Sequence, residues 1–104
     1  MLEKRRHARA TIDLPVAFAL KGVVDQSGGI GKDISLGGMF IETETPATFG
    51  GEVVVRIRLR TPSGEQEFSL PGVVRWVRSG GMGVQFGLLG AVETHAITEM
   101  TAGR

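Results

Sequence analysis

Three arginines near the start of the chain, Arg5, Arg6 and Arg9, are the first residues whose type and spacing can support chemistry. An arginine presents a planar fork of N–H donors that matches phosphate oxygens and the O6/N7 edge of guanine, and it can also stack on a base. Arg5 and Arg9 form an R-x-x-x-R motif. Two arginines with this spacing, on an extended or turning segment, can grip one ligand from two sides.

A second group lies in the middle of the chain, where Asp33, Ser35 and Gly38 form a D-x-S-x-x-G motif. The Asp33 carboxylate can accept from the N1–H and N2–H₂ groups of guanine, and the Ser35 hydroxyl can donate to a phosphate or a base. Side chains two residues apart on a strand face the same way, so both would point to one surface. Gly38 is expected to leave room for a ligand or to adopt a positive φ. Asp33 has a second interpretation, as a salt-bridge partner that orients the arginines.

Each of these features also has a purely structural interpretation. Taken alone, R-x-x-x-R is typical of a solvated basic tail, and D-x-S-x-x-G is typical of a turn. The alternating residues Arg56, Arg58 and Arg60 indicate the solvent face of a strand more than a second anion site. Trp76 stands among valines, so packing in the core or at a barrel rim is the default, and stacking on a base is the alternative.

The sequence has no cysteine, and its two histidines, His7 and His95, are far apart. It therefore lacks a thiolate site and any histidine pair with metal-ligand spacing. The carboxylates are scattered, and Ser35 has no evident general base. We expect a protein that is not an enzyme, with no catalytic residues, no metal and no cofactor.

The formal net charge is only +1, but four of the twelve lysines and arginines fall within residues 4–9. A local basic cluster on a near-neutral domain favours a small anionic ligand over duplex DNA. No apolar run approaches the roughly twenty residues that a membrane span needs. The basic start is not followed by an apolar stretch of signal-peptide length. A cytoplasmic location is the simplest expectation.

The length of 104 residues suits one domain, residues 1–104. Apolar and polar residues alternate in short runs between Gly/Pro turns, and this pattern is typical of strands. The expected strands are 11–20, 30–34, 39–43, 53–60, 65–78 and 82–88. Only Ala91–Met100 has helical spacing, with Val92, Ala96 and Met100 on one face. About six strands and one terminal helix predict a mainly β fold, a small antiparallel barrel or sandwich.

The predicted organisation is a basic N-terminal arm at 1–10, a β-barrel at 11–88 and a C-terminal helix and tail at 89–104. Residues 26–29 are expected to form a turn. Proline cannot donate a ladder hydrogen bond, so Pro15 is expected at an edge or bulge. The long fifth strand is expected to bend near Pro71.

The two motifs, in this order and followed by short β segments, resemble the signature of the PilZ domain family of bacterial cyclic di-GMP receptors. Residues 3–9 resemble the family's N-terminal arm, and residues 33–41 resemble its central motif. Residues 72–77 and 83–86 resemble its last two strands. The resemblance implies a six-stranded antiparallel β-barrel with a short C-terminal α-helix, and cyclic di-GMP held between the arm and the barrel.

Carried over position by position, the resemblance implies a set of ligand-binding residues. These are Arg5, Arg6, Arg9, Asp33, Ser35, Gly38 and Trp76. Arg6 is an additional contact, and Trp76 occupies a position where some members place a ring against a guanine. The expected function is that of a receptor and adaptor in motility or biofilm regulation. Ligand would order the arm, and an unknown downstream protein partner would read the new surface.

Two other functions stay open on the sequence. One is a nucleotide-independent protein-interaction module of the same fold, of the motility or pilus type. The other is a small β-barrel that binds single-stranded RNA through its basic arm and exposed aromatic residues. The aromatic content of 6% argues against the RNA-binding alternative.

Overall fold

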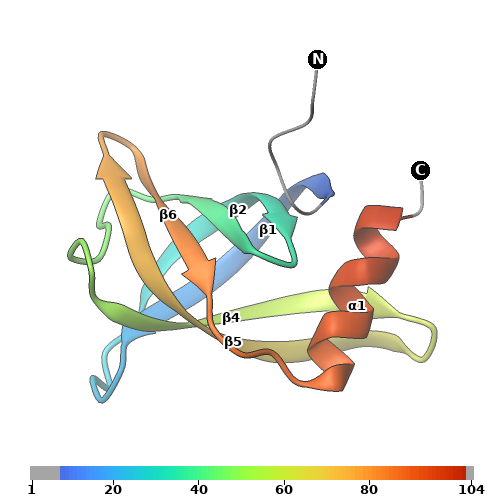
Figure 1. The fold of residues 1–104 in the computed structure, drawn as a ribbon. Coiled ribbons are helices and arrows are strands. Elements are labelled where there is room, and N and C mark those ends of the chain that lie inside the picture. The colour runs from blue at the N-terminus through green and yellow to red at the C-terminus, as the bar shows by residue number, and fades with distance from the viewer. Residues whose placement is uncertain (1–7, 103–104) are drawn as a thin grey trace.

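A computed structural model describes residues 8–102 of the chain. Within them the chain forms six strands and one helix (Figure 1). Their bounds are β1 Arg9–Leu20, β2 Ser27–Ser35, β3 Gly38–Glu42, β4 Glu52–Thr61, β5 Gly64–Arg78, β6 Gly81–Phe86 and α1 Ala91–Ala102. The strands close into a barrel in the order β1-β2-β3-β6-β5-β4, and all neighbours are antiparallel. The structure confirms the six-stranded antiparallel barrel with a C-terminal helix.

The barrel interior is filled by alternate residues of each strand, and β4 shows this most clearly. Its inward side chains, from Val53 to Leu59, are at most 1% exposed. Its outward side chains include Arg56 and Arg58, which lie 3.8 Å from Glu67 and 3.6 Å from Glu65 on β5. The arginine row therefore faces solvent, as the alternation predicted, and two of its members, Arg56 and Arg58, form ion pairs with β5.

Helix α1 packs against β1, β2 and β4 (Figure 1). It buries Ala96 and Ile97 and rests Met100 on the core. Val92 is 57% exposed, so the face that Val92, Ala96 and Met100 were predicted to share is not buried at its Val92 end. The buried stripe runs through Ile97 instead, because that residue is fully enclosed at the barrel end. Within residues 8–102, no helix has the length and apolarity to cross a membrane.

Several predicted boundaries differ from the observed ones. Strand β1 begins at Arg9, so Arg9 belongs to the barrel rather than to the predicted arm. Strand β2 begins at Ser27, within the predicted turn, because residues 27–29 pair with β1. Strand β6 ends at Phe86, two residues before the predicted end, and the Gly87 N–H beyond it donates to the Pro71 carbonyl of β5.

Both prolines were predicted at irregular points of the sheet, and a bulge is found beside Pro15 but not at Pro71. Pro71 pairs with Val54 in unbroken register, so the irregularity of β5 does not lie there. Pro15 pairs with Ile30 inside a closed barrel and is therefore not on an edge. The bulge expected near Pro15 lies just before it, between Thr11 and Leu14.

Register shifts also occur between Gly31 and Asp33 on β2, and between Val74 and Trp76 on β5. At each of these, one extra residue enters the strand, namely Lys32 or Arg75. A bulge of this kind reverses the side to which the following residues point. Strict alternation from the buried Val74 would send Trp76 into the core, whereas the bulge sends it to the outer surface. The same argument places Asp33 outside.

Candidate functional site

The candidate site lies on the outer surface of the barrel, where the strand register aligns residues in rows across the sheet. In the first row, Asp33 pairs with Phe40, Phe40 pairs with Gly83, and Gly83 pairs with Trp76. The row crosses β2, β3, β6 and β5, a width of about 14 Å at the usual strand spacing. It places a carboxylate at one side and an indole at the other.

The second row lies two residues further along the strands, about 7 Å away. Arg9 pairs with Ser35, and Gly38 pairs with Gln85. The turn between β2 and β3 links these pairs, since the Ser35 hydroxyl lies 3.5 Å from the Gly38 carbonyl that it can donate to. The second row therefore has an arginine at one side and an amide at the other.

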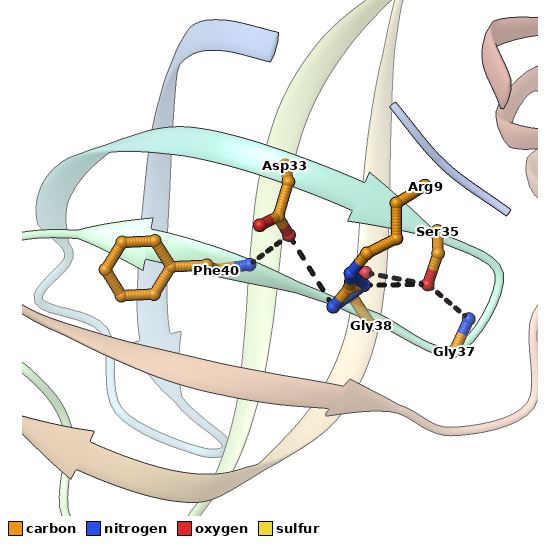
Figure 2. A network of polar contacts seen from close by, with 6 residues as sticks. All are labelled: Arg9, Asp33, Ser35, Gly37, Gly38 and Phe40. Carbon is orange, nitrogen blue, oxygen red and sulfur yellow. Dashed lines mark hydrogen bonds and ion pairs between the residues drawn. The ribbon is translucent and has the colours of Figure 1, made fainter. Parts of the chain in front are cut away.

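The side chains of Arg9, Asp33 and Ser35 point toward one another (Figure 2). Arg9 Nη1 donates to the Ser35 Oγ at 3.2 Å, and its Nη2 lies 3.6 Å from Asp33 Oδ1. Ser35 is 3% exposed and its Oγ also accepts from the Gly37 N–H at 3.1 Å. Asp33 Oδ1 accepts from the Phe40 N–H at 3.3 Å. The two motif residues of β2 therefore hold one arginine fork over the barrel.

Lys32, the extra residue of the β2 bulge, points to a different partner. Its Nζ donates to Asp13 Oδ1 on β1 at 3.0 Å. This hydrogen bond and the charge of Asp13 raise the pKa of Lys32 above its ordinary value. Asp13 thereby holds the ammonium of Lys32, and Asp33 keeps Arg9 as its ion-pair partner.

An aromatic pair forms the other side of the site. The rings of Phe40 and Trp76 stack with centroids 5.3 Å apart and planes 15° apart. The Arg78 guanidinium lies 4.8 Å from the Trp76 ring centroid and 5.6 Å from that of Phe40. Gly81 and Gly83 lie beneath the rings, and a Cβ atom at either would collide with them. Trp76 is 39% exposed, so of the two packing positions predicted by default, the core and a barrel rim, the core is wrong.

Gly38 is required by close packing rather than by an unusual backbone. Its φ is not positive, so that part of the prediction is wrong. A Cβ at this position would collide with the carbonyl oxygen of Val84 on β6. The absence of a side chain at Gly38 lets β3 approach β6 closely enough for Gly38 to pair with Gln85 in the second row.

These rows line a groove of about 560 Å³, a volume within the range of small-molecule sites. Its lining residues are Arg9, Asp33, Ser35, Gly37, Gly38, Met39, Phe40, Arg75, Trp76, Arg78, Gly83, Val84 and Gln85. The lining has three arginines against one aspartate, which favours an anionic ligand. In residues 8–102, no group of histidines, cysteines and carboxylates is arranged to hold a metal.

Five residues singled out from the sequence meet in this groove. They are Arg9, Asp33, Ser35, Gly38 and Trp76. Arg5, Arg6 and His7 lie outside the described residues. Sequence reasoning missed the remaining polar and aromatic lining, namely Phe40, Arg75, Arg78 and Gln85. Phe40 had a readable signal, since it is an aromatic residue at an outward position between two inward ones.

Comparisons with solved structures show the same fold. The inhibitor of motility MotI/DgrA of Bacillus subtilis matches with a TM-score of 0.83 and 18% identity, over 99% of this chain and 52% of that chain. The PilZ domain of YcgR from Escherichia coli, solved with c-di-GMP, matches with a TM-score of 0.76 and 13% identity, over 97% and 91%. The MrkH–c-di-GMP complex of K. pneumonia matches with a TM-score of 0.70 and 18% identity, over 99% and 52%.

This chain thus spans about half the length of MotI/DgrA and of MrkH. A search of curated proteins finds no significant match. The family model described as PilZ domain matches residues 3–102, nearly the whole chain. Together with the barrel, this match confirms the resemblance drawn from the two motifs: the chain belongs to the PilZ domain family.

Proposed function

We propose that this domain binds cyclic di-GMP in the groove on the outer surface of the barrel. The observation that carries the proposal is the convergence of Arg9, Asp33 and Trp76 in one groove with a positively charged lining. Two of the similar structures, those of YcgR and MrkH, are described as containing c-di-GMP. The residues present offer what a guanine nucleotide requires: an arginine fork, a carboxylate, a flat ring and cationic groups.

The two rows suggest how the ligand lies. A guanine over the first row can stack on the half-exposed Trp76 ring and direct its N1–H and N2–H₂ donors to Asp33. The sugar and phosphate then lie over the second row, about 7 Å away, within reach of Arg9. Asp33 and Ser35 also orient Arg9, so their loss would weaken binding even without direct contact with the ligand.

We extend this proposal to Arg5 and Arg6. Arg9 begins β1 at the side of the groove, and four residues of extended chain span at most about 14 Å. Arg5 can therefore reach a ligand in the groove from its attachment at Arg9. In this proposal the two arginines close over the ligand, and the altered surface is read by a partner protein.

Tryptophan fluorescence tests the proposed site directly, because Trp76 is the single tryptophan of the chain. We expect cyclic di-GMP to change the emission in a saturable manner, with no change from cyclic di-AMP at the same concentration. A saturable response to both dinucleotides would contradict guanine selectivity. Binding detected by calorimetry without any change in emission would place the ligand away from Trp76.

Replacing Trp76 by alanine is expected to weaken cyclic di-GMP binding by about tenfold to a hundredfold, because base stacking on an aromatic ring contributes about 1–3 kcal/mol. Trp76→Phe keeps a ring and should retain most of the affinity. Calorimetry measures both variants, since neither reports by tryptophan emission. Equal affinities of Trp76→Ala and the wild type would exclude stacking on this ring.

A further inference from the structure

Arg75 is the residue that the bulge adds to β5, and it is placed next to the second row. Val74 pairs with Val84 and Trp76 with Gly83, so Arg75 has no partner in the β6 ladder. Bulges of this kind often redirect a side chain beside a functional site. Here the bulge brings the exposed Arg75 into the lining of the groove together with Gln85.

Gln85 holds the Arg75 side chain by a short hydrogen bond. The Nε–H of Arg75 donates to Gln85 Oε1 at 2.6 Å. A guanidinium is planar, so fixing Nε fixes the plane and leaves the two Nη groups available as a fork. Gln85 pairs with Gly38, which places this fork across the glycine from Arg9.

The two arginines of the groove differ in the charge of their partners. Arg9 is paired with the carboxylate of Asp33. The partner of Arg75 is a neutral amide, and among residues 8–102 no carboxylate forms an ion pair with it. A neutral partner orients a guanidinium without cancelling its charge. Arg75 therefore keeps a full positive charge for a ligand anion.

We infer that Arg75 and Arg9 form a phosphodiester subsite above Gly38, in which Gln85 is the positioning residue for Arg75. The inference rests on the proposed function and specifies which part of the ligand each wall of the groove takes. One non-bridging phosphate oxygen faces each arginine, because Arg9 and Arg75 approach the glycine floor from opposite sides. Base recognition stays with Trp76 and Asp33.

The test is calorimetric titration with cyclic di-GMP at about 50 and 200 mM salt, a range over which charge contacts weaken visibly. Arg75→Ala is expected to bind about tenfold more weakly than wild type, as loss of one charge-assisted contact predicts. Its affinity should also fall less steeply with salt, because one cation fewer faces the ligand. Arg75→Lys should recover the salt dependence but not the full affinity.

Gln85 variants separate positioning from a structural role. Gln85→Glu keeps a hydrogen-bond partner for Arg75, so the melting temperature should be unchanged or higher. Its carboxylate offsets the charge of Arg75, so the variant should bind cyclic di-GMP more weakly and with the reduced salt dependence of Arg75→Ala. Gln85→Ala should bind more weakly with the salt dependence of wild type. Arg58→Ala, which removes an ion-paired arginine on β4, is the matched control and should bind as wild type.

The outcomes distinguish this inference from the proposed function. If the wild type binds cyclic di-GMP and the Arg75 variants bind equally well, the subsite is wrong and the proposed function stands. If Arg75→Ala loses affinity with an unchanged salt dependence, Arg75 contacts a base and the phosphate assignment is overturned. If the wild type itself does not bind, both are wrong.

Discussion

Replacement of Arg9 by alanine is expected to lower the affinity for cyclic di-GMP by about a hundredfold. The guanidinium fork of Arg9 spans Ser35 and Asp33 at the side of the groove, so it is already held in one orientation. In the proposed complex Arg9 donates two hydrogen bonds to the ligand. Each bond from this charged donor contributes about 1.5–3 kcal/mol, so losing both accounts for at least a hundredfold loss of affinity. Calorimetric titration of the variant beside the wild type measures it.

The folded barrel should tolerate the same change. Without Arg9, the Ser35 hydroxyl still contacts the Gly37 N–H and the Gly38 carbonyl, and Asp33 still accepts from Phe40. Because Arg9 and Asp33 are 30% and 33% exposed, their ion pair contributes at most about 1 kcal/mol to stability. Arg9→Lys should bind with intermediate affinity. An Arg9→Ala variant that binds as tightly as wild type would refute the role given to Arg9.

Gly38→Ala is expected to destabilise the fold by about 1–3 kcal/mol, the usual effect of forcing an extra methyl group into a filled space. The obstacle is the Val84 carbonyl, which is backbone and cannot rotate away. Ligand affinity should fall as well, because β3 and β6 must separate where Gly38 meets Gln85. Thermal unfolding should show a fall of about 4–8 °C for each kcal/mol lost.

Gly28→Ala is the matched control for this substitution. Gly28 also lies in a strand, has no positive φ, and a Cβ there would meet nothing closer than the Val16 carbonyl oxygen at 3.9 Å. Its melting temperature and ligand affinity should stay near those of wild type. Equal melting temperatures for the two alanine variants would contradict the claim that position 38 requires glycine because β3 and β6 approach closely there.

The barrel could be predicted from the sequence because apolar and polar residues alternate over long enough runs to mark each strand, even though β1, β2 and β5 each contain a bulge. In β4 the alternation of apolar residues and arginines predicts both the buried face and the solvent face, and the structure adds the ion pairs on the solvent face. The D-x-S-x-x-G spacing likewise predicted that Asp33 and Ser35 share a surface, and they contact one arginine there. In these segments neighbouring residues alone determine the direction of each side chain.

The bulges could not be predicted in this way, and the position of Arg75 in the site follows from the bulge in β5. Alternation counted from the buried Val74 puts Trp76 on the inward side as well, because nothing local marks Arg75 as the extra residue. The outward position of Trp76 also needs a glycine at position 83 on the neighbouring strand β6, because a Cβ there would collide with the indole ring. Nothing in the sequence around Trp76 indicates this partner. Arg75 and Gln85 meet only once β5 and β6 are in register.

The helix prediction failed in one residue for a similar reason. Val92, Ala96 and Met100 have regular spacing, but the burial of α1 is decided by the barrel end, which encloses Ile97. Val92 lies instead in a groove beside Pro62 of the β4–β5 hairpin. The roles of Arg5 and Arg6 stay predictions, since both lie outside the described residues.

The most direct test of the central claim is calorimetric titration of the wild-type domain with cyclic di-GMP, with GMP and cyclic di-AMP as controls. We expect saturable, selective binding of cyclic di-GMP, and the molar ratio will give the number of ligand molecules in the groove. No heat with cyclic di-GMP, together with unchanged Trp76 emission, would contradict the receptor function. That result would favour an interaction module that works without nucleotide.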